Sequence, residues 1–207
     1  MDSLLLKERA VDGQNICLAV ICDGVGSTRG GAFASSSAVK MIGTWFDRIQ
    51  SLECLGLQLR NCVLDINASI AQKVQQRKIS AASTLSALLV CNRHYYIANV
   101  GDSRIYGIIG CQLAQLTQDQ SSNGKLTSWI GCPNRINVFY NEGICQTERF
   151  LICSDGLYKK MEHAYLQKVL EHTGRKNMDK AIDQMVRYVI DQGETDNISA
   201  AIVLCES

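Results

Sequence analysis

Apolar residues are concentrated in short runs bounded by polar or turn residues, a pattern typical of buried β-strands. Two-residue breaks, "NR" at 92–93 and "GD" at 101–102, separate three of these runs and favour an antiparallel meander. The predicted strands cover residues 16–22, 83–91, 94–101, 103–110, 136–140, 149–154 and 197–205.

Helical spacing of apolar residues appears in four segments, which occur as two pairs along the chain. The predicted helices cover residues 32–49, 55–74, 164–172 and 178–190. One strand precedes the first pair, a block of strands separates the pairs, and one strand follows the second. This order favours an α+β protein, an antiparallel sandwich covered by helix layers, over a doubly wound parallel sheet.

The composition limits the classes of partner and compartment. The 207 residues fit one domain, and 21 Lys and Arg nearly balance 20 Asp and Glu, so no charge field predicts a nucleic-acid partner. The ten cysteines form no CxxC pair, which disfavours zinc and is typical of a reducing compartment. The sequence shows no signal peptide and no apolar run long enough for a membrane span. We therefore expect a cytoplasmic monomer without membrane contact.

Four aspartates stand at the ends of the most apolar strands: Asp23, Asp102, Asp155 and Asp196. Any one of them could be an ordinary turn residue, because Asp-Gly is a common hairpin signal. Turn residues have no reason to select core strands, however, and an unpaired buried carboxylate is costly. Carboxylate oxygens suit Mg²⁺ and Mn²⁺, and Gly24, without a Cβ, lets its carbonyl approach an ion.

The motifs around these aspartates resemble those of metal-dependent protein serine/threonine phosphatases of the type 2C family. "AVICDGVG", "AASTLSALLV" and "IANVGDSRIY" resemble the family's Asp-Gly-x-Gly strand, its Thr-containing strand and its Val-Gly-Asp-Ser-Arg hairpin. "LAQLTQDQS", "LICSDGLYKKM" and "TDNISAAIV" resemble three further elements in the same order. The resemblance extends from Asp2 to about Leu204. It rests on six motifs in the same order, whereas a single Asp-Gly pair would not establish it.

This resemblance implies a four-layer αββα sandwich, two mainly antiparallel sheets flanked by helix pairs, and one catalytic domain over residues 1–207. It also implies two Mn²⁺ or Mg²⁺ ions in a cleft at one end. By motif, Asp23 bridges the ions, Gly24 offers its carbonyl, and Asp155 and Asp196 complete one ion's shell. Asp23, Asp155 and Asp196 are therefore the predicted catalytic residues.

Two more aspartates acquire roles from the same resemblance. Asp102 matches the residue that, together with the Asp155 equivalent, holds a weaker third ion in bacterial members. Asp2, which lies 21 residues before Asp23, matches an aspartate that reaches the ions through a water molecule.

The sequence departs from the family pattern at three places. An arginine that grips substrate phosphate usually precedes the first aspartate and is absent here, so either the first residues are missing or phosphate binding is weakened. Ser27, Thr28 and Arg29 replace a histidine often found beside the Asp-Gly-x-Gly strand. Only a short segment separates "LTQDQ" from "SWIGC", where many bacterial relatives carry a longer flap.

The implied reaction is hydrolysis of phosphoserine or phosphothreonine in proteins phosphorylated by a serine/threonine kinase, by a water bridging the two ions. Cys22 and Cys153 lie beside the motifs, but no Cys-x5-Arg loop supports a thiol phosphatase. The main alternative is a pseudophosphatase that binds phosphoproteins or a regulatory partner without turnover. A phosphatase acting on a small anti-sigma-type switch protein and a non-catalytic cation-binding sandwich are the other two.

Overall fold

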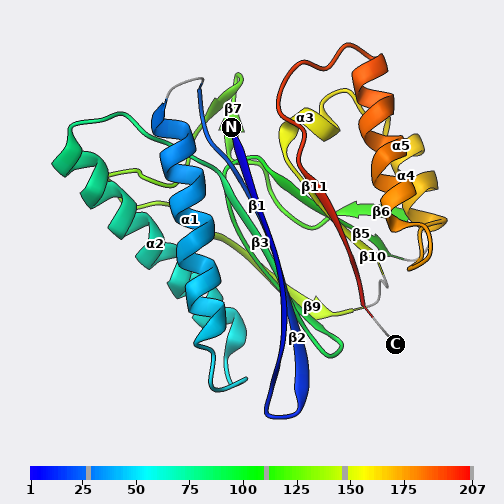
Figure 1. Cartoon of the computed structure of the whole chain (residues 1–207), viewed down its shortest axis with the longest axis horizontal. Helices are drawn as coiled ribbons and strands as arrows, with labels where there is room; N and C mark the ends of the chain where they lie inside the picture. The colour runs from blue at the N-terminus through cyan, green and yellow to red at the C-terminus, as the bar shows by residue number, and fades with distance from the viewer. Residues whose placement is uncertain (27–28, 110–111, 146–148, 206–207) are drawn as a thin grey trace.

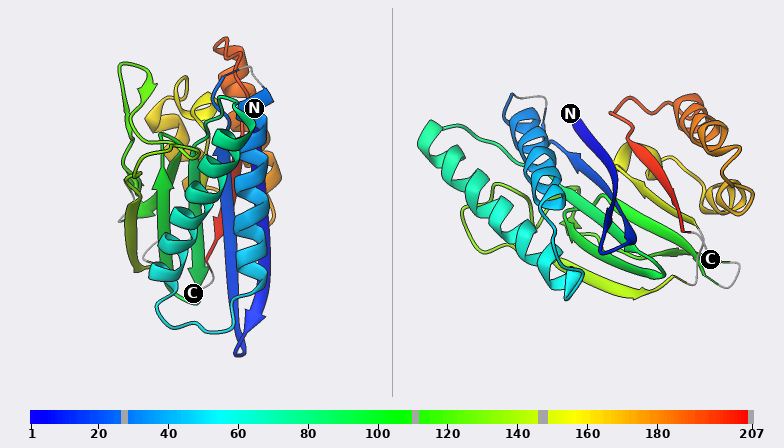
Figure 2. Two further views of the ribbon diagram at one scale, coloured as in Figure 1. Left: turned by 90° about the vertical axis from the view of Figure 1, so that its left-hand side faces the viewer. Right: turned by 60° about the horizontal axis from the view of Figure 1, so that its bottom comes forward.

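The computed structural model describes residues 1–26, 29–109, 112–145 and 149–205, with residue 29 described by its backbone alone. Two antiparallel sheets pack face to face, and helices cover both outer faces (Figure 1). Figure 2 shows from two further directions that the helix pairs lie on opposite sides of the sheets. The predicted fold class, a four-layer αββα sandwich, is confirmed.

The first sheet has five strands in the order β1-β2-β3-β4-β9. Every neighbouring pair is antiparallel, and β1 pairs with β2 over their full length. The strands are β1 (Asp2–Val11), β2 (Gln14–Asp23), β3 (Leu85–Cys91), β4 (His94–Val100) and β9 (Phe139–Ile144).

The second sheet has four strands in the order β11-β10-β5-β6, again antiparallel throughout. A separate two-stranded hairpin, β7 with β8, follows this sheet's last meander strand. The strands are β5 (Arg104–Ile109), β6 (Gln112–Gln115), β7 (Ser121–Ser122), β8 (Lys125–Leu126), β10 (Arg149–Cys153) and β11 (Ala200–Leu204).

The long helices α1 (Arg29–Asp47) and α2 (Leu55–Arg77) pack on the first sheet. Helices α4 (His163–Glu171) and α5 (Met178–Asp191) pack on the second. A one-turn helix, α3 (Asp155–Tyr158), directly follows β10. The four predicted helices are therefore all present, each within a few residues of its expected ends.

Strand β2 is apolar without a break because both of its faces are buried. Leu18 and Val20 point into the core between the first sheet and its helices, whereas Ala19 and Ile21 point into the core between the sheets. A strand that lies inside a four-layer fold has no solvent face, so alternation is absent. Burial on both faces therefore explains why β2 appears in the sequence as an unbroken apolar run.

The strand β1 was not predicted from the sequence. It is an edge strand, and its outward-facing Leu4 and Leu6 are 41% and 52% exposed. Its other face carries Lys7 and Arg9, which reach the C-terminal end of α1: Lys7 pairs with Asp47 at 2.5 Å. Charged side chains thus face a helix end and leucines face solvent, which inverts the usual pattern.

The strand predicted at 136–140 is wrong in position, because β9 begins at Phe139 and continues to Ile144. Ile136 and Val138 are buried, but they anchor the connection from β8 to β9 rather than a strand. Apolar burial alone does not distinguish an anchored loop from a short strand. The end predicted at Gly110 lies outside the described residues.

Asn67 of α2 holds the segment between β8 and β9 in place. Its Oδ1 accepts hydrogen bonds from the Gly131 and Cys132 amides at 2.8 and 3.1 Å, and its Nδ2 donates to the Cys132 carbonyl at 3.1 Å. Asn67→Ala leaves these buried groups without a side-chain partner, so we expect a loss of about 2–4 kcal/mol in unfolding free energy.

Urea denaturation measures this loss. Asn61→Ala is the control, because Asn61 is an exposed residue of the same helix, and its free energy of unfolding should stay within about 0.5 kcal/mol of the wild type. Equal stability of the two variants would contradict the role given to Asn67.

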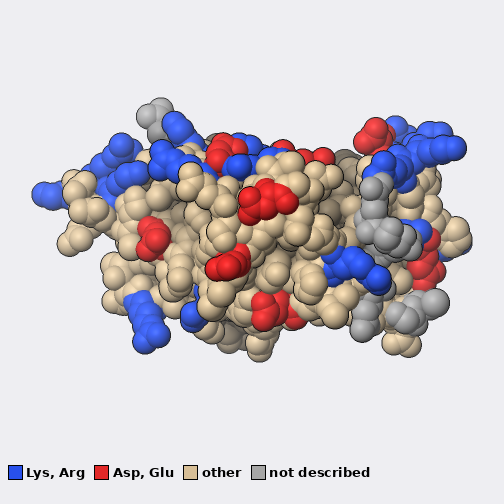
Figure 3. Space-filling view, turned by 90° about the horizontal axis from the view of Figure 1, so that it is seen from below, with Lys and Arg blue, Asp and Glu red and all other residues tan. Residues whose placement is uncertain are grey.

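Charges of both signs are interspersed on the face seen in Figure 3, in agreement with the near balance of the whole chain. Across the described residues, no helix combines the length and apolar character that a bilayer crossing requires.

Candidate active site

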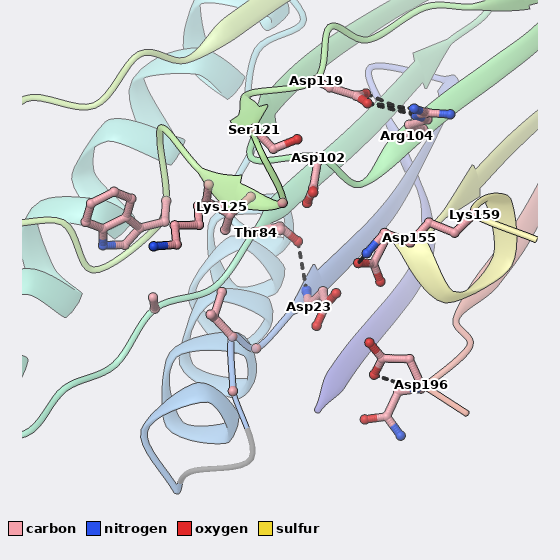
Figure 4. Close-up of a pocket in the computed structure, with 18 of the residues that line it drawn as sticks. Asp23, Thr84, Asp102, Arg104, Asp119, Ser121, Lys125, Asp155, Lys159 and Asp196 are labelled. Atoms are coloured by element: carbon pink, nitrogen blue, oxygen red, sulfur yellow. Dashed lines mark hydrogen bonds and ion pairs between the residues drawn. The ribbon is translucent and has the colours of Figure 1, made fainter. Parts of the chain in front are cut away.

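A cleft of about 920 Å³ is lined by Met1, by Ser121 of β7 and by Asp155 of α3, among others (Figure 4). The N-terminus, β7 and α3 all lie at one end of the sandwich (Figure 1). Asp23, Asp102, Asp155 and Asp196 line this cleft, and we call it the acidic cleft. Its carboxylates come from both sheets: Asp23 ends β2, whereas Asp155 follows β10. The antiparallel order therefore brings strand ends distant in sequence to one place.

Asp2 and Asp23 lie directly opposite each other on β1 and β2. The backbone of Asp23 is fixed by Thr84: its amide donates to Thr84 Oγ1 at 2.9 Å, and its carbonyl accepts from the Thr84 amide at 2.8 Å. Thr84 Oγ1 in turn lies 2.8 Å from the Ser103 hydroxyl, which is buried. These hydrogen bonds thus fix the backbone that carries the Asp23 carboxylate.

Burial makes the charged form of these carboxylates energetically unfavourable. The side chains of Asp2, Asp23 and Asp155 are only 6%, 20% and 14% exposed. Burial raises the pKa of Asp23 to about 8, and the neighbouring charges of Asp2 and then Asp155 add to the shift. Burial, and then the charge of Asp155, also raises the pKa of Asp102. A cation placed among them would relieve this repulsion.

Asp155 is the first residue of α3, and its two oxygens have different surroundings. Oδ1 is buried and has no hydrogen-bond partner, whereas Oδ2 accepts a hydrogen bond from Lys159 Nζ at 2.5 Å. Asp102 lies in the connection from β4 to β5 and lines the same cleft, where Figure 4 shows it above Asp23. A third ion shared by Asp102 and Asp155 stays a prediction.

Asp196 is an exposed residue of the loop before β11. Its Oδ1 accepts from the Asn197 amide at 2.8 Å, and its own amide donates to Glu194 Oε1 at 2.9 Å. It lines the acidic cleft, and Figure 4 shows it below Asp23 and Asp155.

Gly24 has a packing role that the sequence did not suggest. A Cβ on Gly24 would lie 2.4 Å from the Gly31 carbonyl oxygen in the first turn of α1. The glycine therefore lets α1 start against the end of β2. Its carbonyl oxygen, for which a metal contact is predicted, lies 3.3 Å from the Met1 ammonium.

The donor set fits divalent ions. Three buried carboxylate oxygens, both of Asp2 and Oδ1 of Asp155, accept no hydrogen bond, although Asp2 Oδ1 lies 3.6 Å from the Met1 ammonium. Buried carboxylate oxygens of this kind are stabilised by a cation or a proton. As the described side chains stand, no three His, Cys, Asp or Glu residues converge enough to enclose an ion. Side-chain rotation would have to bring the carboxylates together around an ion.

A family model described as "Protein phosphatase 2C" matches residues 2–197. The chain belongs to the protein phosphatase 2C family. The membership predicted from the motifs, and with it the class of protein serine/threonine phosphatase, is confirmed.

Relatives of this phosphatase 2C chain come from several bacteria. A "Putative protein phosphatase" of Mycoplasma genitalium is 28% identical over 230 residues, covering 92% of this chain and 85% of the relative. "Serine/threonine phosphatase stp" of Listeria monocytogenes is 25% identical over 212 residues, covering 90% and 83%. The crystal structure of "Serine/threonine phosphatase Stp1 from Staphylococcus aureus" has a TM-score of 0.88 at 23% identity, covering 100% and 89%, and supports the fold.

Several residues of this phosphatase 2C cleft were not assigned roles from the sequence. Arg104 forms a two-pronged ion pair with Asp119, with Nε–Oδ1 at 3.0 Å and Nη2–Oδ2 at 2.7 Å, and its guanidinium stacks 3.6 Å from the Tyr158 ring centre. Arg104 is therefore already engaged. Lys159 also lines the cleft. Its spacing of four residues from Asp155 is typical of an ion pair along a helix and could have indicated this contact from the sequence.

The residues that replace the family histidine cannot be placed. Ser27, Thr28 and the side chain of Arg29 lie outside the described part of the chain.

Proposed function

We propose that residues 1–207 form one catalytic domain that hydrolyses phosphoserine and phosphothreonine in proteins with two Mn²⁺ or Mg²⁺ ions. One observation carries this proposal: the largely buried carboxylates of Asp23 and Asp155 come from different sheets and line one cleft, where Asp155 Oδ1 accepts no hydrogen bond. Asp23 would hold both ions, Asp155, Asp196 and the Gly24 carbonyl would supply further ligands, and Asp2 would act through a water molecule. Family membership supports the substrate class.

When bound, the ions supply an activated water and offset the charge of the phosphoryl oxygens. The chain's own contribution is rigid positioning. Thr84 fixes the backbone of Asp23 from both directions, and the β10–α3 junction fixes Asp155. Carboxylates held on strand ends need little reorganisation during the reaction, which favours electrostatic stabilisation of the transition state.

The two cysteines beside the motifs do not compete for this role. Cys22 and Cys153 are fully buried. Burial raises the pKa of the Cys153 thiol to about 12, and burial raises the pKa of Cys22 still further. A nucleophilic cysteine needs a lowered pKa and access to the substrate, so these thiols support the metal route.

The far wall of the acidic cleft is formed by the β7–β8 hairpin and by Trp129. Ser121, Lys125 and Leu126 of the hairpin contribute polar and apolar surface on which a phosphorylated peptide segment would lie. The proposed substrate is therefore a protein phosphorylated by a serine/threonine kinase. The proposed setting is the cytoplasm, which the thiol state of the nine described cysteines supports.

Hydrolysis of a phosphothreonine peptide tests the proposal. We expect release of phosphate with Mn²⁺, loss of that activity in excess EDTA, and recovery when Mn²⁺ is returned. The unphosphorylated peptide is the control. Full activity in EDTA would overturn the metal mechanism, and metal binding without any turnover would favour the non-catalytic alternative.

A further inference from the structure

Lys159 lies one helical turn after Asp155, at the C-terminal end of α3. Its side chain is 55% exposed, but its ammonium reaches back to the largely buried Asp155, with Nζ–Oδ2 at 2.5 Å. Figure 4 shows the Lys159 nitrogen beside the Asp155 carboxylate, on the inner side of the acidic cleft. The aliphatic part of the Lys159 side chain is exposed to solvent, and its ammonium contacts the largely buried Asp155. Lys159 therefore places a positive charge inside the cleft.

One carboxylate contacts the ammonium directly, and two others line the same cleft. Lys159 Nζ forms its ion pair with Asp155 Oδ2, and Asp102 and Asp196 also line the acidic cleft. A lysine ammonium beside a carboxylate is charged at neutral pH. Lys159 therefore places a positive charge at Asp155.

The family resemblance implies a weakly bound third ion at Asp102 and Asp155, and Lys159 forms its ion pair with one of these two residues. Such an ion would need Asp102 together with an oxygen of Asp155 on the same side. Asp155 Oδ1 is unpartnered and remains available to the two-ion centre, but Oδ2 already carries the ammonium. A divalent cation at Oδ2 would have to displace a like charge.

Building on the proposed two-ion site, we propose that Lys159 supplies the third cation of this site from the chain itself. The protein then binds two divalent ions, and the ammonium of Lys159 takes the place of a third. An ammonium is a compact point charge that needs no set of six oxygen ligands, so the ion pair with Asp155 suffices to hold it. Lys159 is thus a positioning residue whose charge is independent of the metal concentration.

Counting bound ions tests this inference without an activity measurement. Mn²⁺ is titrated into the full chain up to millimolar concentration, and bound ions are counted by calorimetry and by anomalous scattering from soaked crystals. We expect two ions in the wild type. We expect three in Lys159→Asp, because this variant removes the ammonium and adds a carboxylate beside Asp102 and Asp155.

Two further variants make the comparison specific. Lys159→Ala frees Asp155 Oδ2 without adding a ligand, so it should also gain a third ion, more weakly than Lys159→Asp. Lys40→Asp makes the same charge change at an exposed position of α1 and should keep two ions. Thermal melting in Mn²⁺ establishes that each variant is folded.

The outcomes separate this inference from the proposed function. Three ions in the wild type, falling to two in Asp102→Asn, would overturn the role of Lys159 and leave the phosphatase proposal intact. Two ions in the wild type and in both Lys159 variants would also overturn it. No bound ion in the wild type would overturn the proposed function and this inference together.

Discussion

Asp23→Asn should abolish turnover while it makes the metal-free protein more stable. The substitution removes one charge from the position proposed to bridge both ions, so metal affinity should fall at both positions. The rate should decrease by about 10³-fold or more, as when a main electrostatic contributor to a transition state is lost.

Stability should change in the opposite direction. The pKa of Asp23 is raised by burial from 3.8 to about 8, so the folded, metal-free chain holds a proton that the unfolded chain has lost at neutral pH. Asp23 therefore costs stability above pH 3.8, and the cost grows until about pH 8. One pKa unit corresponds to about 1.4 kcal/mol, so the full shift sets an upper limit of about 6 kcal/mol. Because the Asp23 side chain is 20% exposed and solvent screens part of this energy, we expect Asp23→Asn to gain roughly 1–3 kcal/mol in EDTA at pH 8.

Melting curves in EDTA at a series of pH values measure this gain, which should vanish below the ordinary pKa of 3.8. Asp65→Asn is the matched control, because Asp65 is exposed on α2 and should change neither rate nor stability. Asp102→Asn should lower the rate less and keep two ions bound. If Asp23 were only a turn residue, Asn would serve equally well there, and wild-type turnover in Asp23→Asn would falsify the bridging role.

Gly24→Ala should destabilise the protein and reduce its bound metal. The new Cβ would lie 2.4 Å from the Gly31 oxygen and 2.8 Å from the Met1 oxygen, and both are backbone atoms that cannot rotate away. Either α1 or the end of β2 has to move. We expect a loss of about 2–3 kcal/mol in unfolding free energy, as for other overpacked sites.

The melting temperature should fall by roughly 5–10 °C for a chain of this size. Gly174→Ala is the control, since the nearest atom to its new Cβ is 4.0 Å away. Melting in EDTA and ion counting in Mn²⁺ distinguish a packing defect from a damaged site. An unchanged melting temperature in Gly24→Ala would show that α1 is not packed tightly against β2.

The strands that carry the aspartates could be predicted because they are buried on both faces. β2 and β10 have this character, and their carboxylates stand at the points where the apolar runs stop. β1 could not be predicted from its pattern, since Lys7 faces the end of α1 and Leu6 faces solvent. Asp2 was found only because its motif resembles the family pattern.

Other features of the site depend on contacts between distant parts of the chain. Thr84 supports Asp23 across 61 positions, and nothing local in the sequence indicates that pairing. Lys159 lies close to Asp155 in sequence, but its role requires knowing that a single turn of helix begins at Asp155. For Gly24 the sequence identified the residue and suggested a different reason, because the tight approach of Gly31 depends on where α1 begins.

The proposed metal ligands come from two sheets, and within the described residues no strand of one sheet is hydrogen-bonded to a strand of the other. Asp23 belongs to one sheet and Asp155 to the other, so ions bound between them would act as a clasp across the sandwich. Free energy of ion binding to the folded chain adds to the free energy that keeps the chain folded. In a cell with too little Mn²⁺ or Mg²⁺, such a protein would lose folding stability as well as catalytic activity. Its half-life in the cell would then depend on the metal concentration.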